Sequence, residues 1–263
     1  MERRVFDSLG GECELYGIDI DAAALMRGQA WIVHMHERLT RFDASSELSR
    51  FNASAGAWVD VSPEIEDLLH ESLRAFEVSG GLVNVAVLPA LLAAGYTRDF
   101  AAGPTARADP PPIPPLAEVI QLRPGAARLV GAGVDLGGIA KGWLADRLAA
   151  RLGENVLVNL CGDLFARGGG ETGEGWPVGF GDRTLLLKDM GAATSGTTKR
   201  SWEGGHHLID PRTGLPARTD LSEVSVLAST ATDAEIYAKV ALLLGAEAAP
   251  KWLEGRSQGW SLA

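Results

Sequence analysis

Long apolar runs, cysteine and positive charge are all scarce in this sequence, and each scarcity excludes a class of protein. No stretch reaches the ~18 apolar residues that a membrane-spanning helix needs. Cys13 and Cys161 are the only cysteines. Two are too few for a disulfide framework or a structural zinc site, so we predict reduced thiols. The net charge of −10 argues against nonspecific binding to nucleic acid or anionic membranes.

The beginning of the chain also lacks the features of a signal peptide. Residues 1–7 carry charges, but no apolar segment follows them. We therefore expect a cytoplasmic protein, and a composition of 46% hydrophobic and 22% charged residues fits a soluble globular chain. Six of the 13 prolines fall within residues 101–118. We interpret that stretch as a surface loop inside a single domain that spans residues 1–263.

Hydrophobic periodicity predicts a mixture of helices and strands. Helices are expected over residues 23–42, 62–78 and 232–245, with a fourth that starts inside residues 134–142 and runs to about Leu152. Strands are expected over Asn155–Leu160, Trp176–Phe180, Thr184–Leu187 and Val224–Ala228. The two kinds of element do not alternate regularly, which favours an α+β fold over a doubly wound sheet.

Residues 134–142, Val-Asp-Leu-Gly-Gly-Ile-Ala-Lys-Gly, form the first of two blocks rich in charge and glycine. A strand that ends at Asp135, two glycines and a helix start would present backbone N–H groups and Lys141 to an anion. The spacing is neither a Rossmann fingerprint nor a P-loop. An ordinary strand-to-helix turn with a solvated Lys141 remains an equal alternative.

Residues 205–214, Gly-His-His-Leu-Ile-Asp-Pro-Arg-Thr-Gly, form the second block. Histidine is suited to proton transfer near neutral pH, and arginine to binding phosphate or carboxylate. One histidine at most need be functional. For Asp210 and Arg212 we favour a structural turn, in which the carboxylate caps backbone N–H groups and pairs with the guanidinium.

Two shorter polar segments are ambiguous on their own. Residues 193–196, Ala-Thr-Ser-Gly, could line a nucleotide pocket or form a plain polar loop. Residues 45–52 could be no more than a capped helical turn.

Taken together and in order, these segments resemble the ApbE family of flavin transferases. The resemblance is carried by six blocks: 42–52 with its Ser-Glu-Leu-Ser motif, 81–89, 135–142, 158–163, 194–196 and 207–214. It implies a single α+β domain with antiparallel sheets that binds FAD between its loops. Such enzymes split the pyrophosphate of FAD and transfer FMN to a Thr or Ser hydroxyl of an acceptor flavoprotein, releasing AMP. Nucleic acid and membrane are not expected partners.

The resemblance also implies roles for individual residues. His207 is the candidate base for the acceptor hydroxyl, and Lys141 a catalytic cation near the phosphates. Asp135 would orient Lys141 or a ribose hydroxyl. The full set of residues expected to bind the flavin nucleotide is Leu9, Glu47, Ala86, Val87, Asp135, Gly137, Lys141, Trp143, Ser195 and Asp210.

Several positions depart from the family pattern. Members usually bind Mg²⁺, with side-chain ligands that correspond to Glu235 and Lys239; Ala140 and Glu235 are the metal candidates here. An ammonium cannot ligate Mg²⁺. We therefore suggest that Lys239 replaces part of the metal's charge and that Glu235 positions Lys239, although a plain i,i+4 pair would look the same.

The remaining departures are smaller. Leu9 replaces an early Met, and Cys161 replaces a glycine. Asn84, Val85 and Ala86 stand where Asp, Pro and Thr are usual. These changes keep two alternatives open: an FAD pyrophosphatase that uses water as acceptor, and a flavin-binding protein without catalysis.

Overall fold

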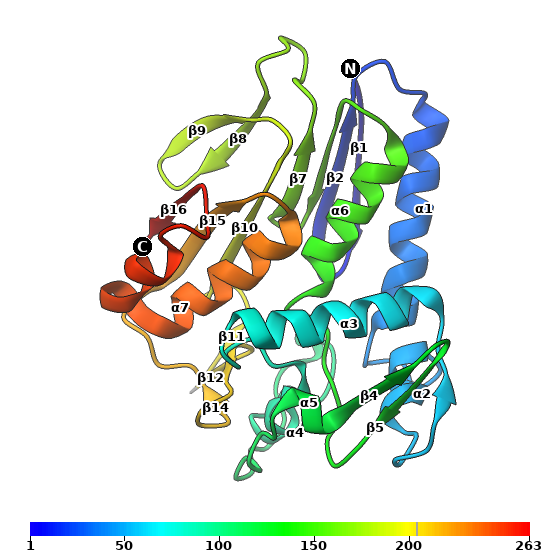
Figure 1. Cartoon of the computed structure of the whole chain (residues 1–263), viewed down its shortest axis with the longest axis vertical. Coiled ribbons are helices and arrows are strands. Elements are labelled where there is room, and N and C mark those ends of the chain that lie inside the picture. The colour runs from blue at the N-terminus through cyan, green and yellow to red at the C-terminus, as the bar shows by residue number, and fades with distance from the viewer. Residues whose placement is uncertain (204) are drawn as a thin grey trace. The chain divides into compact units, whose positions relative to one another are not determined.

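The computed structural model describes residues 1–203 and 205–263, which pack into two compact units (Figure 1). Unit 1 comprises Met1–His36, Ile139–Gly196 and Leu221–Ala263, and unit 2 comprises Glu37–Gly138 and Thr197–Asp220. Both units combine helices with antiparallel strands, which confirms the α+β prediction. That the whole chain is one domain stays a prediction. Within the described residues, no helix has the length and apolar character needed to cross a membrane.

A seven-stranded antiparallel sheet forms the centre of unit 1. Its order is β1-β2-β6-β7-β10-β15-β16. The bounds are β1 Glu2–Ser8, β2 Gly11–Gly17, β6 Val156–Leu160, β7 Asp163–Arg167, β10 Met190–Gly196, β15 Glu223–Ala228 and β16 Gly259–Leu262. The hairpin of β8 (Trp176–Phe180) and β9 (Arg183–Leu187) is a separate two-stranded sheet whose buried residues Trp176, Val178 and Leu187 share a hydrophobic cluster with residues of the central sheet. All four predicted strands are therefore confirmed to within a residue or two.

Two helices cover the sheet of unit 1. Helix α6 (Ala140–Leu152) packs on β6 and β7, and α7 (Ala231–Leu253) packs on β10 and β15 (Figure 1). The prediction placed the end of α7 near Gly245, where the backbone is indeed non-helical with a φ of 79°. Helical structure continues beyond this kink to Leu253, so the predicted end was too early. The start and end predicted for α6 are confirmed.

The two helices lie close enough that one caps the other. A Cβ on Gly142 of α6 would lie 2.5 Å from the carbonyl oxygen of Ala231, so only glycine fits at that contact. Asp146 of α6 accepts hydrogen bonds from the backbone N–H groups of Ala231 and Thr232 at 2.8 and 2.9 Å. These are first-turn donors of α7 that have no partner within their own helix.

Unit 2 is built mostly from short elements. Its helices are α2 Glu47–Asn52, α3 Pro63–Val78, η1 Val85–Val87, α4 Leu88–Ala93, η2 Phe100–Ala102 and α5 Leu116–Val119. Its strands are β3 Val59–Asp60, β4 Ile120–Arg123, β5 Ala126–Leu129, β11 Ser201–Trp202, β12 Gly205–His206, β13 Ile209–Asp210 and β14 Leu215–Pro216. Helix α1, Ala22–Leu39, begins in unit 1.

The helix predictions in this region hold with small changes. Ser62 caps α3 by accepting from the N–H of Ile65, and Ser46 caps α2 by accepting from the N–H of Ser49. Helix α1 stops at Leu39, three residues before the predicted end. The proline-rich stretch is irregular in its middle, but Leu116–Val119 forms a helical turn that was not predicted.

Candidate active site

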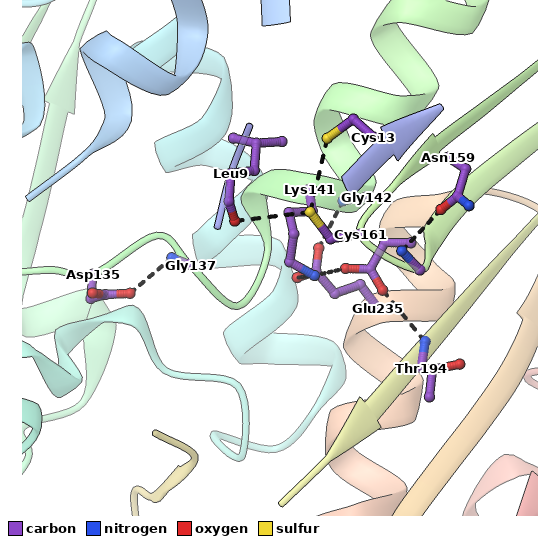
Figure 2. A network of polar contacts seen from close by, with 12 residues as sticks. Leu9, Cys13, Asp135, Gly137, Lys141, Gly142, Asn159, Cys161, Thr194 and Glu235 are labelled. Atoms are coloured by element: carbon purple, nitrogen blue, oxygen red, sulfur yellow. Dashed lines mark hydrogen bonds and ion pairs between the residues drawn. The ribbon is translucent and has the colours of Figure 1, made fainter. Parts of the chain in front are cut away.

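Asp135 lies in an irregular segment of unit 2, where it is held on both of its carboxylate oxygens. Oδ1 accepts from the backbone N–H of Gly137 at 2.8 Å, as Figure 2 shows. Oδ2 accepts from Nε of Arg41 at 2.6 Å. The side chains of Arg41 and Asp135 are 6% and 18% exposed, so this ion pair is largely shielded from water. The acidic group of the first block is therefore rigidly oriented by an arginine that the sequence analysis did not identify.

The prediction of a strand that ends at Asp135 was wrong. Strand β5 ends at Leu129, and residues 133–136 have no regular structure. The side chain of Asn52 takes the place of a neighbouring strand: its amide donates to the carbonyl of Val134 at 2.9 Å and its oxygen accepts from the Val134 N–H at 2.8 Å. A side-chain amide thus satisfies the backbone groups that a sheet would otherwise pair.

Lys141 lies in the first turn of α6, in unit 1, where it bridges two carboxylates (Figure 2). Its ammonium forms an ion pair with Asp163, whose side chain is 2% exposed, and lies 3.7 Å from Oε1 of Glu235. Asp163 in turn accepts from the N–H of Thr194 at 3.4 Å. Within unit 1, Asp163 and Glu235 therefore hold Lys141 in place, and the expectation that Asp135 orients Lys141 or a ribose hydroxyl stays a prediction.

Glu235 is buried, and its contacts are those of a helix cap. Its Oε2 accepts from the backbone N–H of Gly142 at 2.8 Å, in the first turn of α6. Ile139, which precedes that helix, provides no side-chain cap. The carboxylate thus satisfies an unpaired N–H and lies at the positive end of the helix dipole. The expected role in positioning Lys239 stays a prediction, and Lys239 itself is half-buried one turn further along α7.

Two tight hairpin turns of unit 1 bring Leu9 and Cys161 together. Leu9 and Gly10 join β1 to β2 with φ angles of 55° and 82°, and Cys161 and Gly162 join β6 to β7 with 60° and 98°. Two-residue hairpins favour positive φ at both positions, which suits glycine. Cys161 therefore adopts a backbone conformation that explains why the family pattern has glycine there.

The two cysteines lie side by side in the reduced form, as predicted. Their Sγ atoms are 3.9 Å apart, and Cys161 Sγ also approaches the carbonyl oxygens of Ser8 and Leu9 (Figure 2). The hydrogen bond with Cys161 and burial raise the pKa of the Cys13 thiol. Cys13 is consequently a neutral thiol at physiological pH.

The two histidines of unit 2 have different roles. His206 uses both ring nitrogens: Nδ1 accepts from the N–H of Leu208 at 3.2 Å, and Nε2 donates to the carbonyl of Ala217 at 3.0 Å. His207 directs Nδ1 toward the carbonyl of Arg200 at 3.4 Å. Donation to that carbonyl places the proton on Nδ1 and the lone pair on Nε2, as a base requires.

Asp210 and Arg212 form the structural turn that we favoured. The Arg212 guanidinium contacts both carboxylate oxygens of Asp210, at 2.7 to 3.1 Å, and the Arg212 N–H donates to Oδ1. The hydrogen bond to Asp210, more than its charge, raises the pKa of Arg212. The turn fixes the segment immediately after His207.

The other predicted flavin contacts are spread over both units. In unit 2, Glu47 accepts from the Ser62 N–H at 2.8 Å and from Arg38, while Ala86 is buried and Val87 partly buried. In unit 1, Ser195 lies on β10, and Trp143 is 4% exposed within α6. The burial of Ala86 and Trp143 leaves their side chains in the core, so any contact they make with a ligand would be modest.

Comparison with known proteins identifies the family. The sequence profile of the ApbE family matches residues 12–261. The chain belongs to the ApbE family. An FAD:protein FMN transferase of Treponema pallidum is 34% identical over 238 residues, which cover 77% of this chain and 66% of that protein, just under two thirds. A protein of the same name from Haemophilus influenzae is 28% identical and covers 84% and 72%.

Solved ApbE structures share the fold. The flavinyl transferase ApbE of Pseudomonas stutzeri has a TM-score of 0.84 at 20% identity, covering 100% of this chain and 93% of that one. The ApbE protein of Thermotoga maritima has a TM-score of 0.81 at 22% identity, covering 95% and 88%. The structural similarity shows that the chain shares the fold of these ApbE proteins.

The residues at the expected metal positions have their own contacts or charge in this chain. Glu235 already receives the Gly142 N–H and lies beside the Lys141 ammonium, and the second ligand position holds Lys239. Among the residues that the structure describes, no group of three or more His, Cys, Asp or Glu side chains could hold a metal. Mg²⁺ prefers several oxygen ligands and is disfavoured beside ammonium groups.

Sequence reasoning missed three residues that organise the site: Arg41, Asn52 and Asp163. Arg41 contacts a partner 94 residues away, so local spacing gives no signal for it. Asn52 and Asp163 belong to the blocks at 42–52 and 158–163 that carry the family resemblance, but only the fold brings them to Val134 and Lys141.

Proposed function

We propose that this chain is an FAD:protein FMN transferase that moves FMN from FAD to a Thr or Ser hydroxyl of an acceptor flavoprotein. Family membership and the activity for which its relatives are named support the reaction class. The observation that carries the proposal is the ring orientation of His207, which leaves Nε2 with the lone pair in the neutral form.

The chemistry is a substitution at the phosphorus atom of the FMN half. Nε2 of His207 takes the proton of the acceptor hydroxyl as the oxygen attacks, so a phosphoester P–O bond forms. The P–O bond to the bridging oxygen of the pyrophosphate breaks, and AMP leaves with that oxygen. Developing negative charge requires cations, and we assign one of these to Lys141, which Asp163 and Glu235 hold in a single orientation.

We further propose that protein cations supply much of the charge that Mg²⁺ provides elsewhere in the family. Lys239 occupies a usual ligand position, and Glu235 is occupied as a helix cap. Activity should therefore depend only weakly on magnesium. Complete loss on chelation, with recovery at stoichiometric Mg²⁺, would contradict this assignment.

The first experiment incubates the purified chain with FAD, with and without EDTA, and with and without a flavoprotein domain that carries an acceptor Thr or Ser. Release of AMP with a mass gain of one FMN on the acceptor supports the transferase. AMP release that does not depend on the acceptor and yields free FMN indicates a pyrophosphatase. Binding of FAD with no AMP in any condition indicates a flavin-binding protein.

The two histidines offer a matched pair of variants. H207N should lower the turnover rate by about 10²- to 10⁴-fold, the usual contribution of a general base. H206N should instead lower stability, because His206 bonds two backbone groups of the turn. Equal turnover in H207N and the unaltered chain would remove His207 from the mechanism.

A further inference from the structure

In unit 2, only one of the two N–H donors on one edge of the Arg41 guanidinium has a hydrogen-bond partner among the described residues. In a guanidinium, Nε and Nη2 lie on the same edge, which typically grips both oxygens of one carboxylate. Here Nε donates to Oδ2 of Asp135, while Oδ1 is turned to the Gly137 N–H. Nη2 is buried and has no hydrogen-bond partner among the described residues. Beside the Asp135 carboxylate, Nη2 is therefore left without an acceptor among the described residues.

The guanidinium is also fixed from its faces. Its central carbon lies 4.3 Å from the centre of the Phe42 ring and 4.5 Å from that of Tyr96. Two aromatic faces and one carboxylate leave it little freedom to find another acceptor in the protein. Leaving a charged donor unsatisfied in a buried position is costly, so such a group in a native fold calls for an explanation.

A second unpartnered donor flanks the same tyrosine. The ring of Trp202 lies 5.8 Å from that of Tyr96, and its Nε1 is likewise buried without an acceptor among the described residues. Among the described residues, only four buried side-chain nitrogen or oxygen atoms have no hydrogen-bond partner. Two of them belong to Arg41 and Trp202, which both contact the ring of Tyr96. A Cβ on Gly205 would lie 3.1 Å from Trp202 Nε1, so glycine keeps the space in front of the indole nitrogen clear.

We propose that Arg41 and Trp202 are binding residues for the dinucleotide substrate, donating from Nη2 and Nε1 to its acceptor oxygens or ring nitrogens. This rests on the proposed function, because Asp135 belongs to the block expected to bind FAD. Phe42 is 40% exposed and covers one face of the guanidinium, whereas Nη2 donates from its edge. Arg41 thereby also positions Asp135.

The test is direct binding of FAD, AMP and FMN, followed by fluorescence or calorimetry, on R41K and W202F. In R41K, lysine keeps the positive charge beside Asp135 but lacks the paired Nε and Nη2 donors of a guanidinium. In W202F, phenylalanine keeps an aromatic ring but lacks the indole N–H. Each variant should weaken FAD binding at least about tenfold, together with binding of at least one half of the dinucleotide. R123K, which alters an arginine stacked on Trp58, is the control and should bind as the unaltered chain.

Binding of all three ligands by R41K and W202F at unaltered affinity would overturn the proposal. If a variant fails to fold, a structure of the unaltered chain with FAD decides instead: an acceptor within about 3.2 Å of Nη2 or Nε1 supports it, and neither donor meeting the ligand overturns it. The proposed function fails separately. If the unaltered chain releases no AMP from FAD, the transferase is wrong, while the binding comparison remains valid.

Discussion

Glu235 of α7 accepts a hydrogen bond from the backbone N–H of Gly142 in the first turn of α6, at 2.8 Å. Asp146 of α6 does the same for Ala231 and Thr232 in the first turn of α7. Each helix therefore provides the N-terminal cap of the other. Desolvation raises the pKa of Asp146, although its hydrogen bonds with Thr232 and Ala231 act in the opposite direction.

E235A should destabilise the chain by about 1–3 kcal/mol, because it leaves a buried N–H without an acceptor and removes a partner of Lys141. E235Q retains an oxygen that can accept from Gly142, so its loss should be smaller. Urea unfolding of both variants measures the difference. Equal stability of E235A and the unaltered chain would show that the cap contributes nothing and would return Glu235 to consideration as a metal ligand.

Asn84 should not tolerate the aspartate that is usual in the family. Its Nδ2 donates to the carbonyl of Pro114 at 2.9 Å, while its Oδ1 accepts from the Ala86 N–H at 2.9 Å. N84D retains the second bond but sets a carboxylate against a carbonyl, which should cost about 1–3 kcal/mol at pH 7. The loss should shrink at low pH, where a protonated carboxyl can donate to Pro114. A loss that does not vary with pH contradicts this explanation.

Cys161 should show the energetic effect of its positive φ. C161A and C161G both remove the sulfur, but only glycine adopts a φ of 60° without strain. We expect C161G to be about 1 kcal/mol more stable than C161A, measured by thermal or urea unfolding. Equal stability of the pair would mean that the turn relaxes and that glycine in the family pattern has another cause.

The sequence predicted well those helices and strands that bury one face, because burial of one face places hydrophobic residues at regular intervals along the sequence. Helix α3 and strand β6 are examples, each placed within a residue or two of its observed bounds. The helix predicted over residues 232–245 was ended too early, since the sequence does not reveal whether packing continues a helix beyond a kink at Gly245. Helix α7 continues because its later residues Ala249 and Leu253 are fully buried.

The candidate site was predictable only in its motif residues. His207 could be preferred over His206 through the family pattern, and the ring contacts now give a physical reason. The partners of Asp135 and Lys141 could not be found, because ion pairs between distant segments leave no local pattern. Within its own unit, each of the two motif residues has an oppositely charged neighbour from a distant part of the chain, Arg41 for Asp135 and Asp163 for Lys141.

Glu47 should make stability depend on pH in the acid range. Burial tends to raise the pKa of its carboxyl, but hydrogen bonds from Ser62 and Arg38 outweigh burial and lower the pKa below its usual value of 4.5. The folded chain thus binds a proton there less readily than the unfolded chain does. The stability from Glu47 is fully present above pH 4.5 and is lost as the pH falls through the lower folded value.

E47Q should therefore cost about 1–3 kcal/mol at pH 7, and the gap from the unaltered chain should close as the pH falls below about 4.5. Urea unfolding at several pH values measures this gap. E71Q removes a carboxylate from a surface pair with Arg74 and serves as the control, with an effect within about 1 kcal/mol throughout. A gap for E47Q that stays constant down to pH 3 would mean that the hydrogen bonds of Glu47 do not depend on its charge.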